Sequence, residues 1–361
     1  MGKQNRKRLI RQFTIPLLAI ICGLLLAAVL LLFADKSPSA AIQSIFRDAF
    51  SCNSFNNCNL FTTFSLATPL LLTGLSAVVA FRSGIFSIGQ EGQMMLGAIT
   101  AAYLGYWVSL PDNVHSIVIA IGAIIVGGIY GWFAGWLKIR LGINEIISTI
   151  ILSEIAILLL LYLVNFPMRA DQGATAYSPK IHDTAMLTVF APGSKFGTGF
   201  VIAVSAVVLV YIYLWKSGKG YEQRMSGEAP RFAFFGGIKS EKAALRGMFI
   251  SGGLAGLAGA IEVMGVHYRI NQGFNLMNLG FDGLSVAILG LVHPIGVFIV
   301  GIFLAGIRMG AQLGLQFELG IPRELGGTII GFMILFVAAE KLFQKLFDIN
   351  LKELFRKKKN D

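Results

Sequence analysis

Long apolar segments alternate with short polar segments along nearly the whole chain. An α-helix needs about 20 mostly apolar residues to cross a hydrocarbon core about 30 Å thick, and many of the apolar segments approach that length. The short alternating segments of a transmembrane β-barrel do not occur in the sequence. The pattern predicts an all-α, polytopic membrane protein with about ten transmembrane helices, some of them broken or re-entrant. The predicted spans are residues 13–34, 63–82, 91–110, 115–137, 145–165, 198–215, 245–266, 281–292, 294–310 and 325–343.

The composition supports a membrane protein. Of the 361 residues, 55% are hydrophobic and only 14% are charged, and the mean hydropathy is +0.71. A soluble domain of this size would need more polar residues to cover its surface. We expect a single membrane domain over residues 1–361, made of an extra N-terminal helix with an external segment (1–62), a membrane core (63–343) and a basic cytoplasmic tail (344–361).

The basic residues orient the predicted spans. They gather in four stretches, at residues 3–11, 138–140, 216–246 and 341–359. If both termini are cytoplasmic and the chain crosses ten times, all four stretches face the cytoplasm, as the excess of Lys and Arg in cytoplasmic loops requires. The net charge of +11 is thus explained by topology, and we assign no nucleic acid partner to the basic tail.

The first apolar segment, residues 13–34, has two interpretations. A cleaved signal peptide also has a basic head, but its apolar part is usually about 7–15 residues long and ends in small residues. This segment is longer and ends in Leu-Phe-Ala-Asp-Lys. We therefore favour a retained first helix.

Two of the three cysteines, Cys52 and Cys58, lie in the segment that this topology places outside the cell. A disulfide between them is compatible with an oxidising compartment, and two free thiols are the alternative. We do not expect a metal site there, since no histidine or further cysteine is near.

A polar stretch, FRSGIFSIGQEGQMMLG, separates the second and third spans. Its glycines at 84, 89 and 92 predict a break in the helix, and irregular backbone in a membrane survives only inside protein or beside a watery cavity. Gln90, Glu91 and Gln93 then begin the next helix, whose positive end favours a carboxylate. Either Glu91 only caps a helix and the glutamines satisfy nearby backbone groups, or these residues line a translocation path, as ionisable groups within spans usually do.

A second stretch, LGFDGLSVAILG at residues 279–290, resembles the first in its pattern of glycine, acid, glycine and apolar run. The two stretches run in opposite directions across the membrane in the predicted topology. Inverted repeats in transporters produce such pairs, and the substrate site lies where the repeats meet. The candidate pathway residues are Phe86, Gln90, Glu91, Gln93, Asn144, Glu145, Phe281, Asp282 and Ser285.

The polar residues of the fifth span lead to different interpretations at its start and in its interior. Asn144 and Glu145 fit a helix start near the inner surface as well as they fit a cavity. Glu154 lies deeper in the span, and leaving it buried without a partner would cost several kcal/mol. We therefore expect Glu154 to have a partner or water.

The inner segment 216–244 is predicted to contain a loop, a short helix and a break at Gly236 and Gly237. The helix either docks a cytoplasmic partner or belongs to an ordinary solvated linker. Exposed aromatic residues at 232, 234 and 235 favour docking, because they would otherwise leave a costly apolar surface. Glycine stripes in the fourth span (127, 131, 135) and the seventh (252, 256, 259) are expected to allow close helix packing.

The sequence contains no Gly-x-x-x-x-Gly-Lys-Ser/Thr phosphate loop, and its four histidines lack the spacing of metal ligands. His293, which precedes a proline, is expected to lie in a turn. We therefore predict a protein that is not an enzyme and holds no metal or cofactor of its own.

Four segments together resemble the permease subunits of bacterial ABC importers for nucleosides, which belong to the branched-chain amino acid and simple-sugar permease family. They are ATPLLLTGLSAVVAFRSGIFSIGQEGQMMLGA, GINEIISTIILSEIA, SGGLAGLAGAIEVMG and GFDGLSVAILGLVHPIGV. The resemblance covers roughly residues 60–340. The extra first helix and external segment resemble the longer of the two permeases that such systems usually encode.

The resemblance implies a bacterial cytoplasmic membrane location and a set of partners. These are a second, related permease, a cytoplasmic ATPase that binds ATP and Mg²⁺, and an extracytoplasmic binding protein. The cargo would be a nucleoside, with a simple sugar or a branched-chain amino acid as the alternative and a membrane scaffold without transport as a further one. The resemblance also implies that residues 228–238 match the helix that couples to the ATPase. The candidate coupling residues are Glu228, Pro230, Arg231, Phe234, Phe235 and Gly237.

Overall fold

The computed structural model describes residues 37–54, 57–112, 114–170, 175–274 and 278–310, together with residues 313 and 331. The chain divides into two compact units, residues 1–51 with 306–361 and residues 52–305. The first predicted span and nearly all of the last lie outside the described residues. The count of ten transmembrane helices therefore stays a prediction.

The first unit contains α2 (Pro38–Phe50), and its N-cap Ser37 accepts a hydrogen bond from the backbone N–H of Ala40. The second unit holds the remaining elements. Its helices are α3 (Asn59–Arg82), α4 (Gln90–Trp107), α5 (Val114–Leu141), α6 (Glu145–Asn165), α7 (Thr198–Lys216), α8 (Gly218–Glu228), α9 (Pro230–Phe235), α10 (Ser240–Ile261), α11 (Leu279–Leu289) and α12 (Pro294–Gly310), whose last turn belongs to the first unit. Its short elements are β1 (Cys52–Ser54), β2 (Asn57–Cys58), β3 (Val189–Ala191), β4 (Phe196–Gly197), two 3₁₀ turns at Asp183–Ala185 and Pro192–Ser194, and a π-helical turn, η3 (Glu262–His267).

The described part of the chain is mostly helical, as the apolar pattern predicts. Each predicted span from 63–82 to 294–310 is a helix in the structure, with ends that differ by a few residues. Within the described ranges, five helices are long and apolar enough to cross a membrane: α3, α5, α6, α7 and α10 with η3. α11 has only 11 residues, about half the length needed to span the hydrocarbon core, in agreement with the re-entrant element expected there.

Local sequence explains where neighbouring helices end and begin. Lys138 and Arg140 lie in the last turn of α5, where cations suit the negative end of the helix dipole. Gly142 follows with a φ of +66°, a conformation that glycine adopts without steric cost. Asn144 then caps α6, because its side chain accepts hydrogen bonds from the backbone N–H groups of Ile146 and Ile147 at 2.9 and 3.4 Å.

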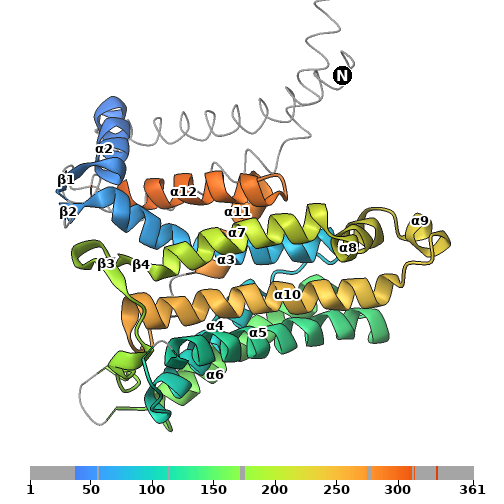
Figure 1. Ribbon diagram of the computed structural model, residues 1–361, viewed down its shortest axis with the longest axis horizontal. Coiled ribbons are helices and arrows are strands. Elements are labelled where there is room, and N and C mark those ends of the chain that lie inside the picture. Colours follow the sequence, from blue (N-terminus) through green and yellow to red (C-terminus); the bar gives the residue numbers. More distant parts are fainter. Residues whose placement is uncertain are drawn as a thin grey trace, which may run out of the picture. The chain divides into compact units, whose positions relative to one another are not determined.

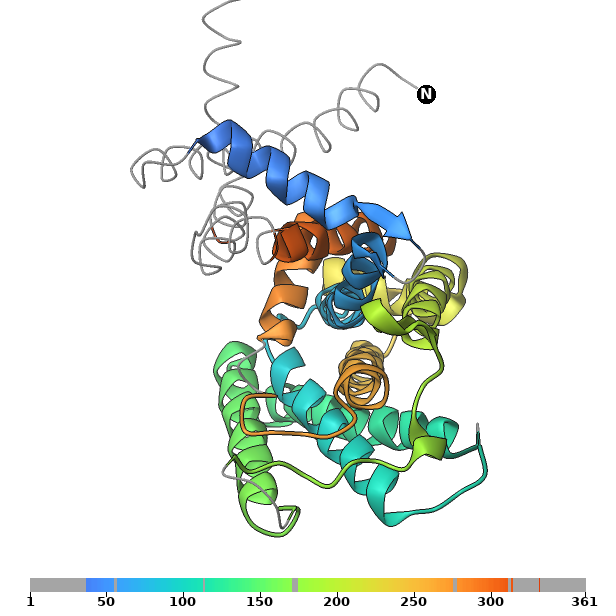
Figure 2. The ribbon, with the colours of Figure 1, turned by 90° about the vertical axis from the view of Figure 1, so that its left-hand side faces the viewer.

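The long helices divide into a central and a peripheral set. In α3 and α10, 78% and 72% of the apolar window is buried, against 28–33% in α5, α6 and α7. Figure 2, which looks along the bundle, shows α10 between α3 on one side and α4 and α5 on the other. The apolar side chains on the outer faces of α5, α6 and α7 are exposed, as helices that face lipid require.

Glycines allow α10 to approach its neighbours at backbone distance, which confirms the expected role of the glycine stripes. A Cβ atom on Gly127 would lie 2.5 Å from the carbonyl oxygen of Gly252 and 2.9 Å from Cα of Gly256. A Cβ atom on Gly259 would overlap the carbonyl oxygen of Met94 in α4. Small residues at such crossings are the usual basis of helix packing in lipid.

The polar segment 216–244 differs from its prediction. The structure has two helices, α8 and α9, where a loop and one short helix are expected. Ser217 begins α8 by accepting a hydrogen bond from the N–H of Gly220 at 3.0 Å. Figure 1 shows α8 and α9 at one end of the bundle, and β3 and β4 at the other.

The opposite end carries two small hairpins, β1–β2 and β3–β4. A disulfide joins Cys52 to Cys58 across the first hairpin. Phe196 of β4 stacks on Phe61 of α3 at 4.8 Å between ring centroids, and Phe64 stacks on Phe200 of α7 at 4.8 Å. The first contact connects the second hairpin to the start of α3, and the second connects the starts of α3 and α7.

The disulfide gives a test of topology. We expect a membrane-impermeant maleimide to label Cys52 and Cys58 in intact cells only after a reductant has been added, because the paired sulfurs do not react. The readout is a mass shift of the purified chain, with the Cys52→Ser, Cys58→Ser double variant as the unlabelled control. Labelling that requires permeabilised cells would contradict the predicted topology.

Candidate functional site

The segment between α3 and α4 is irregular, as its glycines predict. α3 ends at Arg82, Gly84 has a φ of +77°, and α4 begins after Gly89. Gly92, however, lies inside the first turn of α4 and does not break it. Its small size serves packing, because a Cβ atom there would lie 2.6 Å from Cα of Ser153 in α6.

The start of α11 lies deep in the bundle. The hydroxyl of Thr73 in α3 donates to the carbonyl of Leu279 at 3.1 Å, and a Cβ atom on Gly283 would overlap the Thr73 hydroxyl. Thr73 is about 14 Å from the end of α3 at Arg82, at 1.5 Å per residue. The first turn of α11 therefore sits near the middle of the helical layer.

Glu91 connects the starts of α4 and α11. Its carboxylate oxygen Oε2 accepts a hydrogen bond from the backbone N–H of Gly280 at 2.6 Å, and its side chain is buried. A Cβ atom on Gly280 would lie 2.5 Å from Cα of Glu91, so only glycine allows this approach. The structure thus brings the two similar stretches of sequence together, and the carboxylate sits where both helix dipoles are positive.

Gln90 and Gln93 point to other neighbours. Gln93 Nε2 lies against Gly131 of α5, 3.2 Å from where a Cβ atom would be. Gln90 shares a face of α4 with Gly97, seven residues later, and Gly97 packs on Gly256 of α10. Both side chains are buried, and among the described residues neither side-chain atom of the Gln90 amide, nor Oε1 of Gln93, has a hydrogen-bond partner. The three polar residues of α4 therefore surround its first turn and do not converge on one pocket in this conformation.

Phe281 and Ser285 lie on the outer face of α11. Phe281 is 42% exposed, and Ser285 donates a hydrogen bond to the Phe281 carbonyl at 3.2 Å. Phe86 is also exposed and stacks on Phe81 with ring centroids 4.5 Å apart. Asp282 is partly buried in the first turn of α11.

Asn144 and Glu145 lie at a helix start, which agrees with the first of their two interpretations. Asn144 caps α6, and Glu145 forms an ion pair with Lys138 of α5 at 2.6 Å. Lys138 also donates to the carbonyl of Gly84 at 3.2 Å. The pair therefore links α5, α6 and the irregular segment before α4.

Removing the Glu91 carboxylate should destabilise the protein. Glu91→Ala leaves the N–H of Gly280 without its charged acceptor, at a cost of about 1.5–3 kcal/mol, and should lower the thermal midpoint of the purified protein. Gln90→Leu is the matched control on the adjacent residue. Because the Gln90 amide has no partner among the described residues, the leucine should leave the midpoint unchanged or raise it. Equal midpoints for both variants would contradict a capping role for Glu91.

The predicted coupling residues lie at the end of the bundle that carries α8 and α9 (Figure 1). Pro230 begins α9, and Gly237 follows it with a φ of +76°. Phe234 and Phe235 are 75% and 86% exposed, and Arg231 is exposed as well. Glu228, the last residue of α8, forms an ion pair with Arg82 at the end of α3.

Arg82 also holds the turn between α11 and α12. Its Nε donates to the carbonyl of Val292 at 3.1 Å, and its guanidinium lies over the ring of Trp215, 5.4 Å from the centroid. His293 lies in this turn, as predicted, and its Nδ1 accepts from the N–H of Ile295 at 3.2 Å. Burial, with the nearby charge of Arg82, lowers the pKa of His293, which keeps the ring neutral and able to accept.

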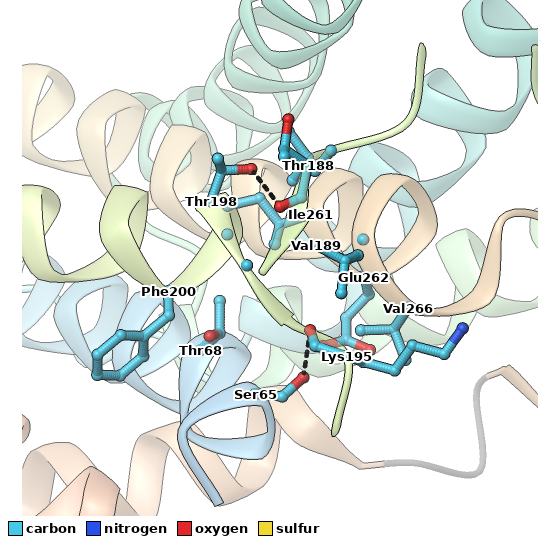
Figure 3. A pocket seen from close by; sticks show the side chains of 14 residues that line it. Ser65, Thr68, Thr188, Val189, Lys195, Thr198, Phe200, Ile261, Glu262 and Val266 are labelled. Atoms are coloured by element: carbon cyan, nitrogen blue, oxygen red, sulfur yellow. Dashed lines mark hydrogen bonds between the residues drawn. The ribbon is translucent and has the colours of Figure 1, made fainter. Parts of the chain in front are cut away.

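A small pocket at the opposite end contains a residue that the sequence reasoning missed. Figure 3 shows Glu262 with Ser65, Thr68 and Lys195 around this pocket, between α3, the second hairpin, α7 and η3. Its volume is about 20 Å³, room for about one water molecule and far below the size of a ligand site. Glu262 is buried and lies 3.4 Å from His267 Nε2. The sequence did contain a signal for this residue, because Glu262 is an acidic residue inside an apolar run.

Within the described ranges, no group of three or more His, Cys, Asp and Glu side chains is placed to hold a metal ion. The polar groups that the structure gathers are amides, hydroxyls and single carboxylates, which suit hydrogen bonding.

Comparisons with known proteins give a consistent result. The sequence profile of the family described as "branched-chain amino acid transport system / permease component" matches residues 59–338. The guanosine ABC transporter permease protein NupP of Bacillus subtilis (strain 168) is 33% identical over 90% of this chain and 92% of its own. The nucleoside ABC transporter permease protein NupB of Lactococcus lactis subsp. cremoris (strain MG1363) is 28% identical over 92% and 93%. The glucose ABC transporter permease protein TsgB13 of Haloferax volcanii is 27% identical over 91% and 88%.

The first two of these organisms each contain a second matching permease. NupQ of Bacillus subtilis is 26% identical over 67% of this chain, and NupC of Lactococcus lactis is 26% identical over 68%. Permeases similar to this chain thus occur in pairs. No solved structure gives a significant match.

Proposed function

Because the chain belongs to the family of branched-chain amino acid transport permease components, we propose that it is the membrane permease of an ABC importer for nucleosides. The observation that carries the proposal is the similarity to NupP and NupB, which extends over about 90% of each chain. Membership in a permease family makes the chain a membrane protein and a transport subunit, not an enzyme. The sequence lacks a phosphate loop, so ATP and Mg²⁺ would bind to a separate ATPase.

The complete importer would contain further subunits. We propose a second, related permease, for which the pairs NupP with NupQ and NupB with NupC are the support. A cytoplasmic ATPase and an extracytoplasmic binding protein would complete the assembly. The chain would lie in the bacterial cytoplasmic membrane as a single domain of about ten helices, with both termini in the cytoplasm and its external segment, 35–62, on the other side.

In this proposal α9 is the contact with the ATPase. The exposed rings of Phe234 and Phe235, beside Pro230 and Arg231, form an apolar knob with a positive charge at the end of the bundle. Glu228 and Gly237, on either side of α9, set its position through the Arg82 ion pair and the left-handed turn. A groove on the ATPase would cover the rings and remove them from water.

We propose that the cargo passes the region where α4 and α11 begin. Gln90, Gln93, Phe281, Asp282 and Ser285 would flank the path after the helices have moved, with Phe86, Asn144 and Glu145 nearer its inner end. Buried amide atoms of Gln90 and Gln93 have no hydrogen-bond partner among the described residues, which supports a second conformation, because such groups usually find a hydrogen bond. Side-chain amides suit a neutral, hydroxylated cargo, and an aromatic ring can stack on a base. Glu91 would hold the two helices together.

A simple sugar or a branched-chain amino acid is the second candidate for the cargo. The similarity to TsgB13, a glucose permease, and the family's description favour it. A scaffold without transport fits less well, since it has no need of buried polar groups at broken helices.

Uptake measurements would separate the two cargoes. Cells that lack the gene should lose uptake of radiolabelled nucleoside and regain it on complementation. Excess unlabelled guanosine or uridine should then compete, whereas ribose, glucose and leucine should not. Competition by a sugar or by leucine alone would replace the nucleoside by that cargo.

A further inference from the structure

One carboxylate has an unexpected location. Glu154 lies inside α6, about 14 Å from its first residue and about 17 Å from its last at 1.5 Å per residue. Its side chain is exposed, and no ion pair or hydrogen bond joins it to a described residue. Among the five long apolar helices, it is the only exposed charged residue more than two turns from a helix end.

The position of Glu154 around α6 follows from its neighbours. Ser153 faces α4, where its hydroxyl accepts from the N–H of Gly92 at 3.3 Å. Leu152 packs towards the cluster that includes Ala134 of α5. Successive residues are about 100° apart around a helix, so Glu154 lies on the side of α6 away from α5.

That side is the one nearer to α11. Around α4, Glu91 contacts α11, Gly92 contacts α6 and Gln93 contacts α5. These three residues are consecutive and about 100° apart around the helix, which orders the neighbours of α4 as α11, α6 and α5. Glu154 therefore shares one side of the bundle with the outer face of α11, which carries Phe281 and Ser285. We call Glu154, Phe281, Asp282 and Ser285 the α6–α11 face.

Neither lipid nor a water-filled channel suits Glu154 and the side chains around it on α6. A carboxylate at the middle of the hydrocarbon costs at least about 2.5 kcal/mol and usually faces protein or water. Yet Glu154 is surrounded on α6 by exposed apolar side chains, at Ile150, Ile151, Ile155 and Leu158. An apolar surface with a single charge fits a protein partner that offers apolar packing and one complementary polar group.

We propose that the second permease subunit covers the α6–α11 face and places a hydrogen-bond donor or a cation opposite Glu154. The proposal rests on the assembly of two permeases proposed above, and the cargo path beside Phe281, Asp282 and Ser285 would then lie where the two permeases meet. The proposal also supplies the partner that Glu154 lacks among the described residues. The outer faces of α5 and α7 would remain in contact with lipid, since they expose apolar residues such as Ile125 and Leu209.

Photo-crosslinking in membranes that contain the whole transporter tests this assignment. Benzoylphenylalanine in place of Phe281 should give an adduct with the mass of the second permease. The same group in place of Leu209, on α7, is the control and should give no protein adduct. An adduct at position 281 with a second copy of this chain, or no protein adduct there, would overturn the proposal.

Substitution of Glu154 tests the complementary group. Glu154→Leu should lower the amount of second permease that co-purifies with the tagged chain at least tenfold, because the partner's polar group is left without a carboxylate. Glu154→Gln should lower it less, and Ile155→Leu should not change it. Wild-type recovery with Glu154→Leu would refute the pairing. Neither the crosslinking nor the co-purification experiment uses a cargo. A failed nucleoside uptake assay would therefore leave their results unaffected.

Discussion

Serine in place of both Phe234 and Phe235 is expected to abolish transport by the assembled importer while leaving the permease folded. Burial of a phenylalanine side chain is worth about 1.5–3 kcal/mol. Two such losses would weaken the proposed contact with the ATPase by at least about a hundredfold, since each 1.4 kcal/mol is a factor of ten. Uptake should fall to background, and cargo should no longer stimulate ATP hydrolysis in the reconstituted complex.

The structure provides a matched control for this variant. Phe166 is 69% exposed, at the opposite end of α6 from the α8–α9 end of the bundle. Phe166→Ser removes the same ring from an equally open position, and uptake should persist. Unchanged uptake and ATPase stimulation in the Phe234→Ser, Phe235→Ser variant would exclude α9 as the coupling element. A lowered thermal midpoint would instead indicate that the rings stabilise the permease itself.

A single methyl group at Gly97 is expected to prevent the normal packing of α4 on α10. The added Cβ atom would lie 2.5 Å from the carbonyl carbon of Gly256 and 2.6 Å from its Cα. Backbone atoms cannot turn aside as a flexible side chain can, so the two helices must separate. We expect Gly97→Ala to cost about 3 kcal/mol, the upper range for an overpacked core, and to reduce the yield of monodisperse protein severely.

Gly218→Ala is the control for the methyl group. A Cβ atom at Gly218, in the first turn of α8, would have no atom within 4 Å. Alanine also suits a helix better than glycine does. The yield and thermal midpoint should therefore equal or exceed those of the unchanged protein. Similar behaviour of the two variants would mean that the α4–α10 crossing tolerates expansion.

Periodicity and composition predicted the helices well because long apolar runs have few alternatives in a membrane. The glycine stripes also predicted that α5 and α10 pack closely against other helices, since small residues at helical spacing have one main use in lipid, but they did not indicate that the two helices pack on each other. α8 escaped prediction because its sequence, GKGYEQRMSGE, is polar and contains three glycines. Contacts supplied by the fold decide its conformation, such as the hydrogen bond from Gln223 to the carbonyl of Val79 at 2.9 Å.

The candidate site was predictable in its parts and not in its arrangement. The two similar glycine-acid-glycine stretches indicated that residues near 91 and 280 belong together, and the hydrogen bond from Gly280 to Glu91 joins them. The directions of Gln90 and Gln93 depend on where α4 starts, to within one residue. Sequence reasoning placed Gly92 in the break, whereas the structure places it in the helix. An error of one residue in the start of α4 changes the direction of each side chain by about 100° around the helix axis.

The contact between α8 and the irregular segment at residues 83–89 has a mechanical consequence. A Cβ atom on Gly227 would lie 2.6 Å from the backbone nitrogen of Gly84, and Gln223 Nε2 donates to the Ser83 hydroxyl at 2.8 Å. Backbone rests directly on backbone there, with no compressible side chain between. A displacement of α9 would thus be transmitted through α8 to residues 83–89. Residues 83–89 lead directly into the first turn of α4, which carries Glu91. A movement of α9 caused by the ATPase would therefore change the contact between Glu91 of α4 and Gly280 of α11.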